Sequence, residues 1–413
     1  MKKFLLVSIL CFSIIGLFGI SFSVEPMFTT VQVGETEYLF YSITPVFDFN
    51  AIKIGFGINM FQDEIGGQFY YGNPRNIGSD GTDNLLNAFS LNFLELNFKS
   101  FGARYGHMNT YTHGLGLLMH RYSVPFAKSF DVRLGNTSEG INLKAHVPFQ
   151  IDSWSPFELS QSSKLYFMES TLSLGNLKLS LLGGTNLSLN KEAPLQRNDY
   201  IGSAGIYYDL LFLNTGVEAA VIITEDAENP DNNTFGYLAG IGGGFDFGFL
   251  TFRALPILYM TENTVIGYLD RNYYKEENHT KFLDDKRVGG LFEINSNISD
   301  IFNGNIRFTY NFDSFPVGKI ENEHLEGLVR INSPFEDVPF IVSGFYSRTF
   351  KEDNFFNIFE GLFNEYTTAE YVISYPLFDG LYISYVNYFS YNYENPEESG
   401  FKNRVDMQAS LNF

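Results

Sequence analysis

The chain has 413 residues, a formal net charge of −20 and one cysteine, and aromatic residues make up 17% of it, with 44 Phe and 26 Tyr. A chain this acidic lacks the basic surface that nucleic acids require, which counts against nucleic-acid binding. A single cysteine cannot form an intramolecular disulfide, and no cysteine follows residue 23 to supply thiolate chemistry.

Residues 1–23 are predicted to be a secretory signal peptide. Two lysines precede an apolar run at 4–22 that ends in small residues, where a signal peptidase would cut. The alternative is a transmembrane helix, because the run approaches the ~20 residues that a helix needs to cross a bilayer. The cationic start and the small-residue end favour cleavage, and Cys11 lies inside the run, which argues against lipidation. Residues 24–413 are predicted to form a single domain.

The segments after residue 23 alternate apolar and polar side chains with a period of two, and no run of 18 apolar residues remains there to form a helical span. Clear examples lie at 52–61, 177–190, 305–313 and 368–377. Each is as long as the ~9–11 residues of a tilted membrane-spanning strand. Large aromatic residues with Gly and Asn between them suit strands with one face in lipid and one toward water. The series predicts an all-β, transmembrane, antiparallel up-and-down β-barrel.

Short and long connections alternate along the chain. Tight turns are predicted near Asn50, Lys99-Ser100, Gly175-Asn176, Phe247-Gly248, Ser299 and Asp379-Gly380. The long polar connections are 62–84, 109–127, 225–233, 261–285 and 351–364. This pattern is typical of a barrel with short periplasmic turns and long outer loops.

The strand count is the open point of this prediction. About nineteen strands can be placed between residues 37 and 413, whereas bacterial single-chain barrels have even numbers. Either Met27–Val33 is a further strand that pairs with Val405–Phe413, giving about twenty, or one strand predicted between 101 and 146 is absent, giving about eighteen. We therefore expect about 18–20 strands, and an even number.

One predicted outer loop, 109–127, is far more apolar than an exposed loop should be, because it contains the run GLGLLM at 114–119. It is predicted to fold into the barrel and narrow the pore, with Arg121 facing the lumen. His107, His113 and His120 recur every seven residues, but this is not a close-ligand spacing, so no metal site is predicted.

Charged residues on the predicted inward faces are candidates to line the pore. The candidates are Arg121, Arg253, Arg307, Arg330, Glu293 and Glu326, with Lys53, Lys178 and Glu370 further round. Arg307 and Arg330 lie on neighbouring predicted strands and would form a positive ladder that orients polar solutes. In the alternative, they pair with Glu293 and Glu326 and only neutralise the wall.

Acidic residues gather in the loops at 225–231, 276–285 and 394–398. Carboxylate oxygens in flexible loops suit calcium, but no ordered Asp-x-Asp-x-Asp-Gly spacing is present, so a solvated rim is the favoured interpretation. The chain has no Gly-x-Ser-x-Gly and no His-Glu-x-x-His motif. It is not predicted to be an enzyme, and no cofactor is predicted.

The last nine residues, Val405–Phe413, alternate without a break and end on an aromatic residue. A last strand with an apolar face must be paired on both sides, which a closed barrel in lipid provides. The segment resembles the terminal strand of bacterial outer-membrane β-barrel proteins, whose last residue is typically Phe. The resemblance implies that Ala409, Leu411 and Phe413 form a signal for the barrel assembly machinery.

The resemblance also implies a location in the cell outer membrane, in contact with its lipid. The function it implies is that of a porin-like channel for passive diffusion of small polar solutes or ions, and a homotrimer is compatible with it. Because a fold does not choose a function, a second reading stays open. It is a structural or surface-interaction barrel with a plugged lumen, whose outer loop 261–285 binds a partner.

Overall fold

The structure is a computed structural model of the chain. It describes residues 21–33, 36–63, 67–71, 85–123, 128–135, 140–148, 165–186, 197–226, 233–246, 252–270, 286–298, 301–311, 319–320, 324–333, 339–350, 353–354, 362–378, 381–392, 395–409 and 411–412. The remaining residues, which include 1–20 of the predicted signal peptide, lie outside the described part.

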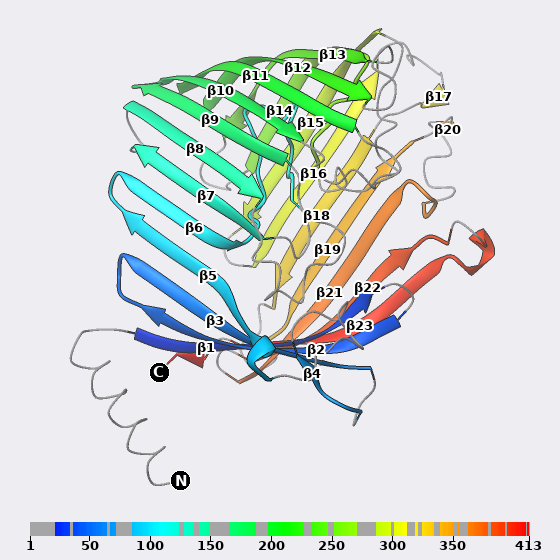
Figure 1. Ribbon diagram of the computed structural model, residues 1–413. Helices are drawn as coiled ribbons and strands as arrows, with labels where there is room; N and C mark the ends of the chain where they lie inside the picture. The colour runs from blue at the N-terminus through cyan, green and yellow to red at the C-terminus, as the bar shows by residue number, and fades with distance from the viewer. Residues whose placement is uncertain are drawn as a thin grey trace.

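Strands make up almost all of the regular structure (Figure 1). The first half contains β1 Ser21–Val33, β2 Thr36–Asp48, β3 Ile52–Gln62, β4 Tyr70–Tyr71, β5 Phe89–Phe98, β6 Phe101–His107, β7 Lys128–Gly135, β8 Gly140–Pro148, β9 Leu165–Leu174, β10 Leu177–Asn186, β11 Arg197–Leu210 and β12 Leu213–Asp226. The second half contains β13 Thr234–Asp246, β14 Phe252–Glu262, β15 Lys286–Ile298, β16 Phe302–Asn311, β17 Lys319–Ile320, β18 His324–Asn332, β19 Ile341–Thr349, β20 Asp353–Asn354, β21 Thr367–Phe378, β22 Leu381–Ser390, β23 Gly400–Ala409 and β24 Leu411–Asn412. Two short 3-10 helices, η2 Leu85–Ala88 and η8 Pro396–Glu398, lie in connections.

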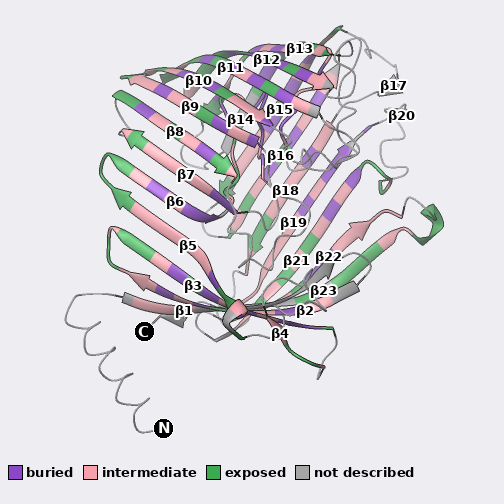
Figure 2. Cartoon of the chain, in the orientation of Figure 1, coloured by how far each residue is buried: buried purple, intermediate pink, exposed green. Residues whose placement is uncertain are grey.

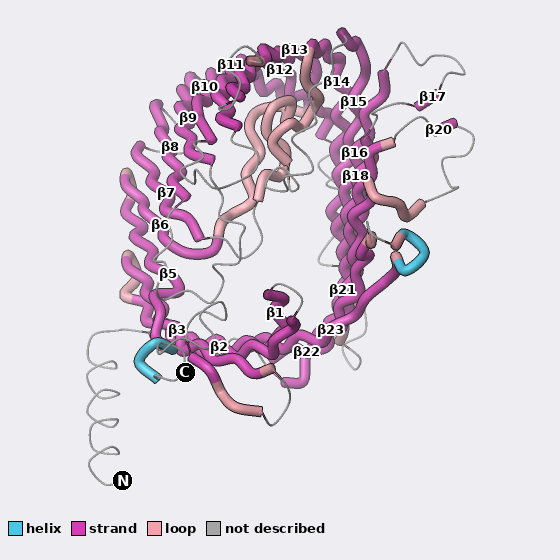
Figure 3. The backbone as a smooth tube through the Cα atoms, turned by 45° about the vertical axis from the view of Figure 1, so that its right-hand side comes forward, coloured by secondary structure: helices cyan, strands magenta, loops and turns pink. Residues whose placement is uncertain are grey.

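The long strands form one antiparallel ring in which each strand pairs with its neighbours in the chain (Figure 3). The sheet has 22 strands by segment, but β4 is a two-residue addition to β3 and β24 continues the line of β23, which leaves twenty long strands. The ring closes between its ends, because Met27 is opposite Gln408 and Val24 is opposite Leu411. The even number and the pairing of Met27–Val33 with Val405–Phe413 are therefore confirmed, except that Phe413 itself lies outside the described residues. β6, β7 and β8 lie between 101 and 148, so the alternative in which a strand is absent there is wrong.

From β3 onward, shorter and longer connections alternate as predicted, whereas β1 and β2 are joined by only two residues. One end of the barrel carries tight turns, such as the one at Asn50, where φ is 66°, and the one at Gly175, where φ is 58°. The tight turn at Leu211-Phe212 was not predicted, because neither residue is a usual turn former. Leu211 nevertheless has φ 48° there. β1 starts and β23 finishes at this same end of the barrel. The long connections lie at the opposite end.

The two faces of the ring have opposite chemistry. Outward positions expose apolar side chains, as in Leu181 (59% exposed) and Ile306 (58%), while inward positions bury polar ones such as Ser180 and Arg307. Buried and exposed residues therefore alternate along the strands (Figure 2). Exposed apolar and buried polar residues are the reverse of a water-soluble protein and are characteristic of a barrel in a membrane. In the described part of the chain, no helix is long and apolar enough to span a membrane.

The first strand starts earlier than predicted. β1 begins at Ser21, so it overlaps the last residues of the predicted signal peptide, 1–23. Its pairing with β2 is continuous from Ser21 opposite Asp48 to Val33 opposite Thr36. Cleavage after residue 23 stays a prediction, as does the division into signal peptide and barrel. It would leave the pairs from Val24 onward intact.

Candidate pore constriction

The connection between β6 and β7 folds into the barrel, as predicted from its apolar sequence. We call its described part, 108–123, the inserted loop; in Figure 3 it lies inside the ring. Leu117 and Leu118 have no exposed surface, and Met119 and Tyr122 are 1% exposed. Full burial of such a side chain is worth about 1.5–3 kcal/mol, so the sequence strongly favours the folded-in position.

The loop has its own hydrogen-bonded frame. Tyr111 and Tyr122 exchange two backbone hydrogen bonds, N to O, of 2.9 and 2.8 Å, which closes the loop at its base. At its turn, the amide of Gly116 donates to the carbonyl oxygen of His113 over 2.8 Å. Gly114 has φ 55°, and a Cβ there would collide with the hydroxyl of Tyr207 on β11. A glycine is therefore required at this turn.

One side of the loop packs against an apolar part of the barrel wall. The wall residues are inward-facing and buried: Phe167, Leu182, Ile201, Ile222 and Leu238, from β9 to β13. Leu118, Met119 and Tyr122 complete this cluster. An inward wall that faced water would be polar, so these apolar residues mark the place where the loop packs. The sequence analysis missed this signal, although Leu182 stands at a polar position of its strand.

A second connection, between β14 and β15, supports the inserted loop. Residues 263–269 of this connection run beside it, with Gly267 N donating to Leu117 O over 2.6 Å and Leu269 N to Leu118 O over 2.9 Å. Tyr268, 1% exposed, donates its hydroxyl to Asp199 Oδ2 over 2.9 Å. The prediction that 261–285 is an outer loop is therefore wrong for 264–269, because burial of Tyr268 and Leu269 against the loop holds this segment inside. Residues 271–285 lie outside the described part.

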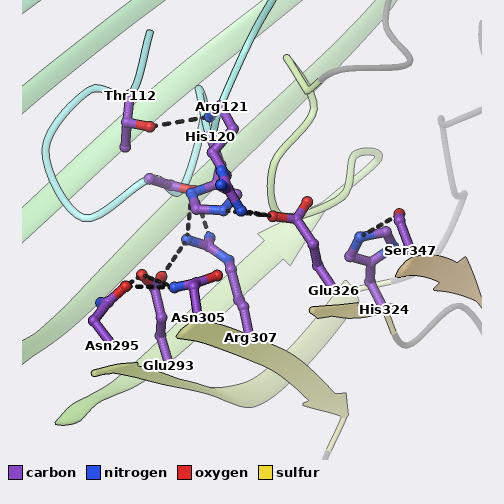
Figure 4. Close-up of polar contacts among 11 residues, drawn as sticks. Thr112, His120, Arg121, Glu293, Asn295, Asn305, Arg307, His324, Glu326 and Ser347 are labelled. Atoms are coloured by element: carbon purple, nitrogen blue, oxygen red, sulfur yellow. Dashed lines mark hydrogen bonds and ion pairs between the residues drawn. The ribbon is translucent and has the colours of Figure 1, made fainter. Parts of the chain in front are cut away.

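The other side of the loop contacts a charged part of the wall through Arg307 (Figure 4). Arg307 is 3% exposed. Its Nη2 donates to the carbonyl oxygen of Gly116 over 2.7 Å, and its Nη1 lies 2.8 Å from His120 Nδ1 and 3.1 Å from Glu293 Oε2. Asn295 and Asn305 each donate to Glu293 Oε1 over 2.9 Å. The buried charge pair is thus fully hydrogen-bonded, and it binds loop backbone as well as wall.

Glu326 on β18 supplies the second charged contact. Arg121 Nη1 donates to Glu326 Oε1 over 2.8 Å, and His120 Nε2 lies 3.5 Å from the same oxygen. Arg121 has φ 53°, an unusual conformation for a residue with a Cβ, and its amide donates to Thr112 Oγ1 over 3.0 Å. The hydrogen bond from the Arg121 amide to Thr112 and the ion pair of its side chain with Glu326 hold this conformation. The strained backbone thereby directs the Arg121 side chain to the wall.

Two further acidic residues hold the loop on the side of β9 and β12. The amide of Leu115 donates to Glu218 Oε2 over 2.6 Å, and Glu218 has no exposed surface. His113 Nδ1 lies 3.2 Å from Glu169 Oε1, while Lys144 donates to Glu169 Oε2 over the same distance. The loop contacts described here therefore extend from β9 to β18.

The wall formed by β2, β3 and β5 has a different character. Four of its side chains are uncharged and bonded in series: Asn59 Nδ2 to Ser90 Oγ (2.6 Å), Ser90 Oγ to Asn92 Oδ1 (2.8 Å), and Asn92 Nδ2 to Thr44 Oγ1 (2.6 Å). Asn92 reaches Thr44 across β3 because its amide lies over Gly57, where a Cβ would collide with it. Two charged residues of this wall, Lys53 and Asp48, pair with each other at the end with tight turns. The interior thus has a charged wall that holds the loop and, on β2, β3 and β5, a series of hydroxyl and amide groups.

The structure brings some of the predicted pore residues into contact with one another and leaves others apart. Arg307 stands opposite Glu293 and Glu326 in the strand register, whereas Arg330 stands opposite Asn303, and its Nε donates to Asn332 Oδ1 over 3.3 Å. Arg307 and Arg330 therefore do not form a ladder at one level. The predicted pairing of Arg307 with Glu293 is present, but Glu326 pairs with Arg121. Arg253 stands opposite Asn295, and its side chain lies outside the described part. Lys53 pairs with Asp48 over 3.0 Å.

Two polar clusters among the described residues contain a histidine and a serine. Ser347 Oγ lies 3.3 Å from His324 Nε2 (Figure 4). In the other cluster, His146 Nδ1 lies 2.7 Å from Asp131 Oδ1, but the nearby Ser129 hydroxyl donates to Asp131 over 3.0 Å and not to the imidazole. A hydrolytic triad requires the hydroxyl and the carboxylate to contact the same imidazole, whereas these two contacts involve different histidines. Within the described ranges, no group of three or more His, Cys, Asp or Glu residues is placed to hold a metal ion.

The charge of His120 makes the loop contact sensitive to acid. A guanidinium has no acceptor, so His120 Nδ1 must accept from Arg307, and the ring is neutral. Burial lowers the pKa of His120, the charge of Arg307 lowers it further, and Glu326 opposes the shift. The unfolded ring binds a proton below about pH 6.5, but the buried ring does so only at lower pH. The stabilisation that the neutral His120 ring gives to the folded loop is therefore complete above about pH 6.5 and is lost as the pH falls below it.

We expect conductance through the barrel to be constant between neutral and alkaline pH and to rise at acid pH, below the range in which a free histidine titrates, as protonation of His120 breaks its bond to Arg307. His120→Gln should remove the rise, because its amide oxygen accepts from Arg307 without titrating. His324→Gln, on the same wall, should keep it. Planar-bilayer recordings across pH test this, and an acid rise that survives in His120→Gln would contradict it.

No protein-family model matches the sequence, and no curated protein matches it. The backbone is similar to several solved structures. The outer membrane channel DcaP of Acinetobacter baumannii has a TM-score of 0.37 and 11% identity over 95% of this chain and 96% of that one. The outer membrane protein OpdK of Pseudomonas aeruginosa has 0.39 and 9%, over 95% and 98%. OccAB1 of Acinetobacter baumannii has 0.40 and 10%, over 95% and 96%. The chain itself is an antiparallel up-and-down β-barrel with a loop folded into its interior.

Proposed function

We propose that the protein is a porin-like channel of the cell outer membrane for passive diffusion of small polar solutes or ions. The observation that carries this proposal is the inserted loop, which is bound to one sector of a wide barrel by both apolar and charged contacts. A barrel of ~16–18 strands already encloses an aqueous channel, and this one has more. A loop fixed on one side narrows such a channel without dividing it.

The wall chemistry suggests which solutes would pass. The charges at the loop are paired with one another, and the bonded series on β2, β3 and β5 consists of hydroxyls and amides, which can bond to neutral polar solutes. Arg121, beside Tyr122 at the base of the loop, keeps 22% of its side chain exposed and would be the charge that a solute meets. We expect weak ion selectivity and passage of uncharged polar molecules. No catalytic role is proposed.

The same proposal assigns roles to the chain ends and partners. Ala409, Leu411 and Phe413 would be read by the barrel assembly machinery, and outer-membrane lipid would cover the outward face. A homotrimer stays a prediction.

Conductance of the purified, folded protein in planar bilayers tests the proposal. Replacing 112–121 with Asn-Gly keeps the Tyr111–Tyr122 base as a two-residue hairpin, and it should increase single-channel conductance several-fold. Removing Pro396–Glu398, an exposed helical turn in another connection, should leave conductance unchanged. If neither the native protein nor the shortened variant conducts, the channel proposal fails.

The second candidate, a plugged structural or interaction barrel, is favoured by one observation. Two connections, the inserted loop and 263–269, lie inside the barrel and are bonded to each other. Conductance that is absent in the native protein but present after replacement of 112–121 would support this candidate over the channel.

A further inference from the structure

A groove of about 410 Å³ crosses the outward face of the barrel between β16 and β21. Its lining residues include Ile306, Gly327, Val329, Gly344, Tyr346 and Tyr371, and Phe363 and Phe401 stand at one end. Ile306 is 58% exposed and Tyr371 39%, so this is the apolar outward surface and not the interior.

Two rows of paired residues explain why the surface is hollow here. In one row, Gly327 is flanked by Ile306 on β16 and Tyr346 on β19. In the next row toward the middle of the barrel, Gly344 is flanked by Val329 and Tyr371. Each glycine removes a side chain between two larger ones, and the two glycines are diagonal neighbours. The result is a furrow about one side chain wide, which descends from the end with long loops.

The upper end of the groove is built from aromatic side chains. The ring centroid of Phe363 lies 4.9 Å from that of Phe401 and 5.2 Å from that of Phe389. The segment before β21 is held on the outward face because the Tyr346 hydroxyl donates to the carbonyl oxygen of Leu362 over 2.8 Å. Aromatic girdles mark the membrane interface of such barrels, so the groove starts at the outer interface and leads inward.

We propose that this groove binds one acyl chain of an outer-leaflet lipid. The inference rests on the proposed membrane location. The groove is continuous with the apolar surface that hydrocarbon covers, and the hydroxyl of Tyr346 already has a protein acceptor. A furrow one side chain wide, closed by aromatic rings above, matches a single extended chain. The flat face of a second barrel could not enter it.

The glycines provide a fold-preserving test. A Cβ at Gly327 would meet nothing within 4 Å, so Gly327→Phe fills the groove without a clash. Gly183 on β10 is a matched control, since it is also outward and its Cβ would also meet nothing within 4 Å, but it does not line the groove. The probe is a phosphatidylethanolamine with a diazirine in one acyl chain, incorporated into vesicles with the full-length protein. Labelled peptides are then quantified by mass spectrometry.

Labelling at 325–346 should exceed labelling around Leu181 and Ile206 several-fold, although these two are among the most exposed apolar residues, at 59% and 56%. Gly327→Phe should reduce it to that background, and Gly183→Phe should not. Equal labelling of both regions would overturn the proposal. Labelling of 325–346 below the background in the native protein, together with a change of oligomeric mass in Gly327→Phe, would also overturn the proposal. These results would show that a second copy of the protein occupies the groove. Conductance is expected to be native in both variants, so a failed groove and a failed channel are distinguishable.

Discussion

Replacing Arg307 with methionine is expected to release the inserted loop and raise single-channel conductance several-fold. Arg307 contacts three groups at once: the carbonyl oxygen of Gly116, the imidazole of His120 and the carboxylate of Glu293. Removing one partner of a buried ion pair costs about 3–5 kcal/mol, because the remaining charge stays buried. This exceeds what one leucine contributes by burial, so the loop should lose its hold on the charged wall.

Two variants separate this effect from a general loss of positive charge. Arg330→Met removes an exposed arginine from the inward face of β18 and should leave conductance near the native value. In the double variant Arg307→Met with Glu293→Gln, no buried charge is left unpaired, and the amide still accepts from Asn295 and Asn305. Thermal stability of the barrel should recover, while conductance stays high because Gly116 and His120 have lost their donor. Native conductance in Arg307→Met would refute the role of this contact.

Deleting Phe413 is expected to reduce the yield of folded barrel by an order of magnitude while export from the cytoplasm continues. The end of the chain closes the ring, where Ser23 is opposite Asn412 and Val24 is opposite Leu411. Phe413 directly follows these paired residues, and a terminal strand that does not dock would leave unpaired backbone groups on β1 and β22 in lipid, each costing several kcal/mol. The same deletion would remove the proposed assembly signal.

Heat-modifiable migration on gels measures the folded fraction of this deletion variant. Phe413→Tyr keeps an aromatic end and should assemble normally. Refolding the deletion variant from denaturant into detergent separates the two causes of a lower yield, failed recognition and failed closure. Recovery there would assign the defect to recognition by the assembly machinery, and continued failure would assign it to closure. A native yield in cells would count against both.

The barrel itself was predictable because the sequence patterns that specify its strands and turns are local. A period of two in segments such as 177–190, together with short turns and long connections, determines antiparallel strands and their order. Parity left a strand at Met27–Val33 as one of two ways to reach an even count, and the pairing of Met27 with Gln408 decides for it. The apolar run at 114–119 was sufficient to predict a loop folded inward, because exposed loops are rarely so apolar.

The contacts of that loop were not predictable, because they depend on distances across the interior. Arg121 and Glu326 are 205 residues apart in sequence, and the choice of Glu326 follows from the position of the loop and not from either strand. The Arg307–Glu293 pair lies within a hairpin and could be anticipated as an alternative. Residues 264–269 read as an outer loop, since Tyr268 and Leu269 alone do not form a pattern.

The attachment of the inserted loop to well-separated strands of one sector of the ring has a mechanical consequence. The loop connects Glu169 on β9 and Glu218 on β12 with Arg307 on β16 and Glu326 on β18, through a short, backbone-bonded segment. A wide, single-layered cylinder flattens easily under lateral pressure, because bending a sheet changes few contacts. A bound segment of fixed length restrains the curvature of the sector from β9 to β18, so changes of shape would have to occur in the rest of the ring. The wall that carries the constriction would then keep its shape when the tension of the surrounding membrane changes.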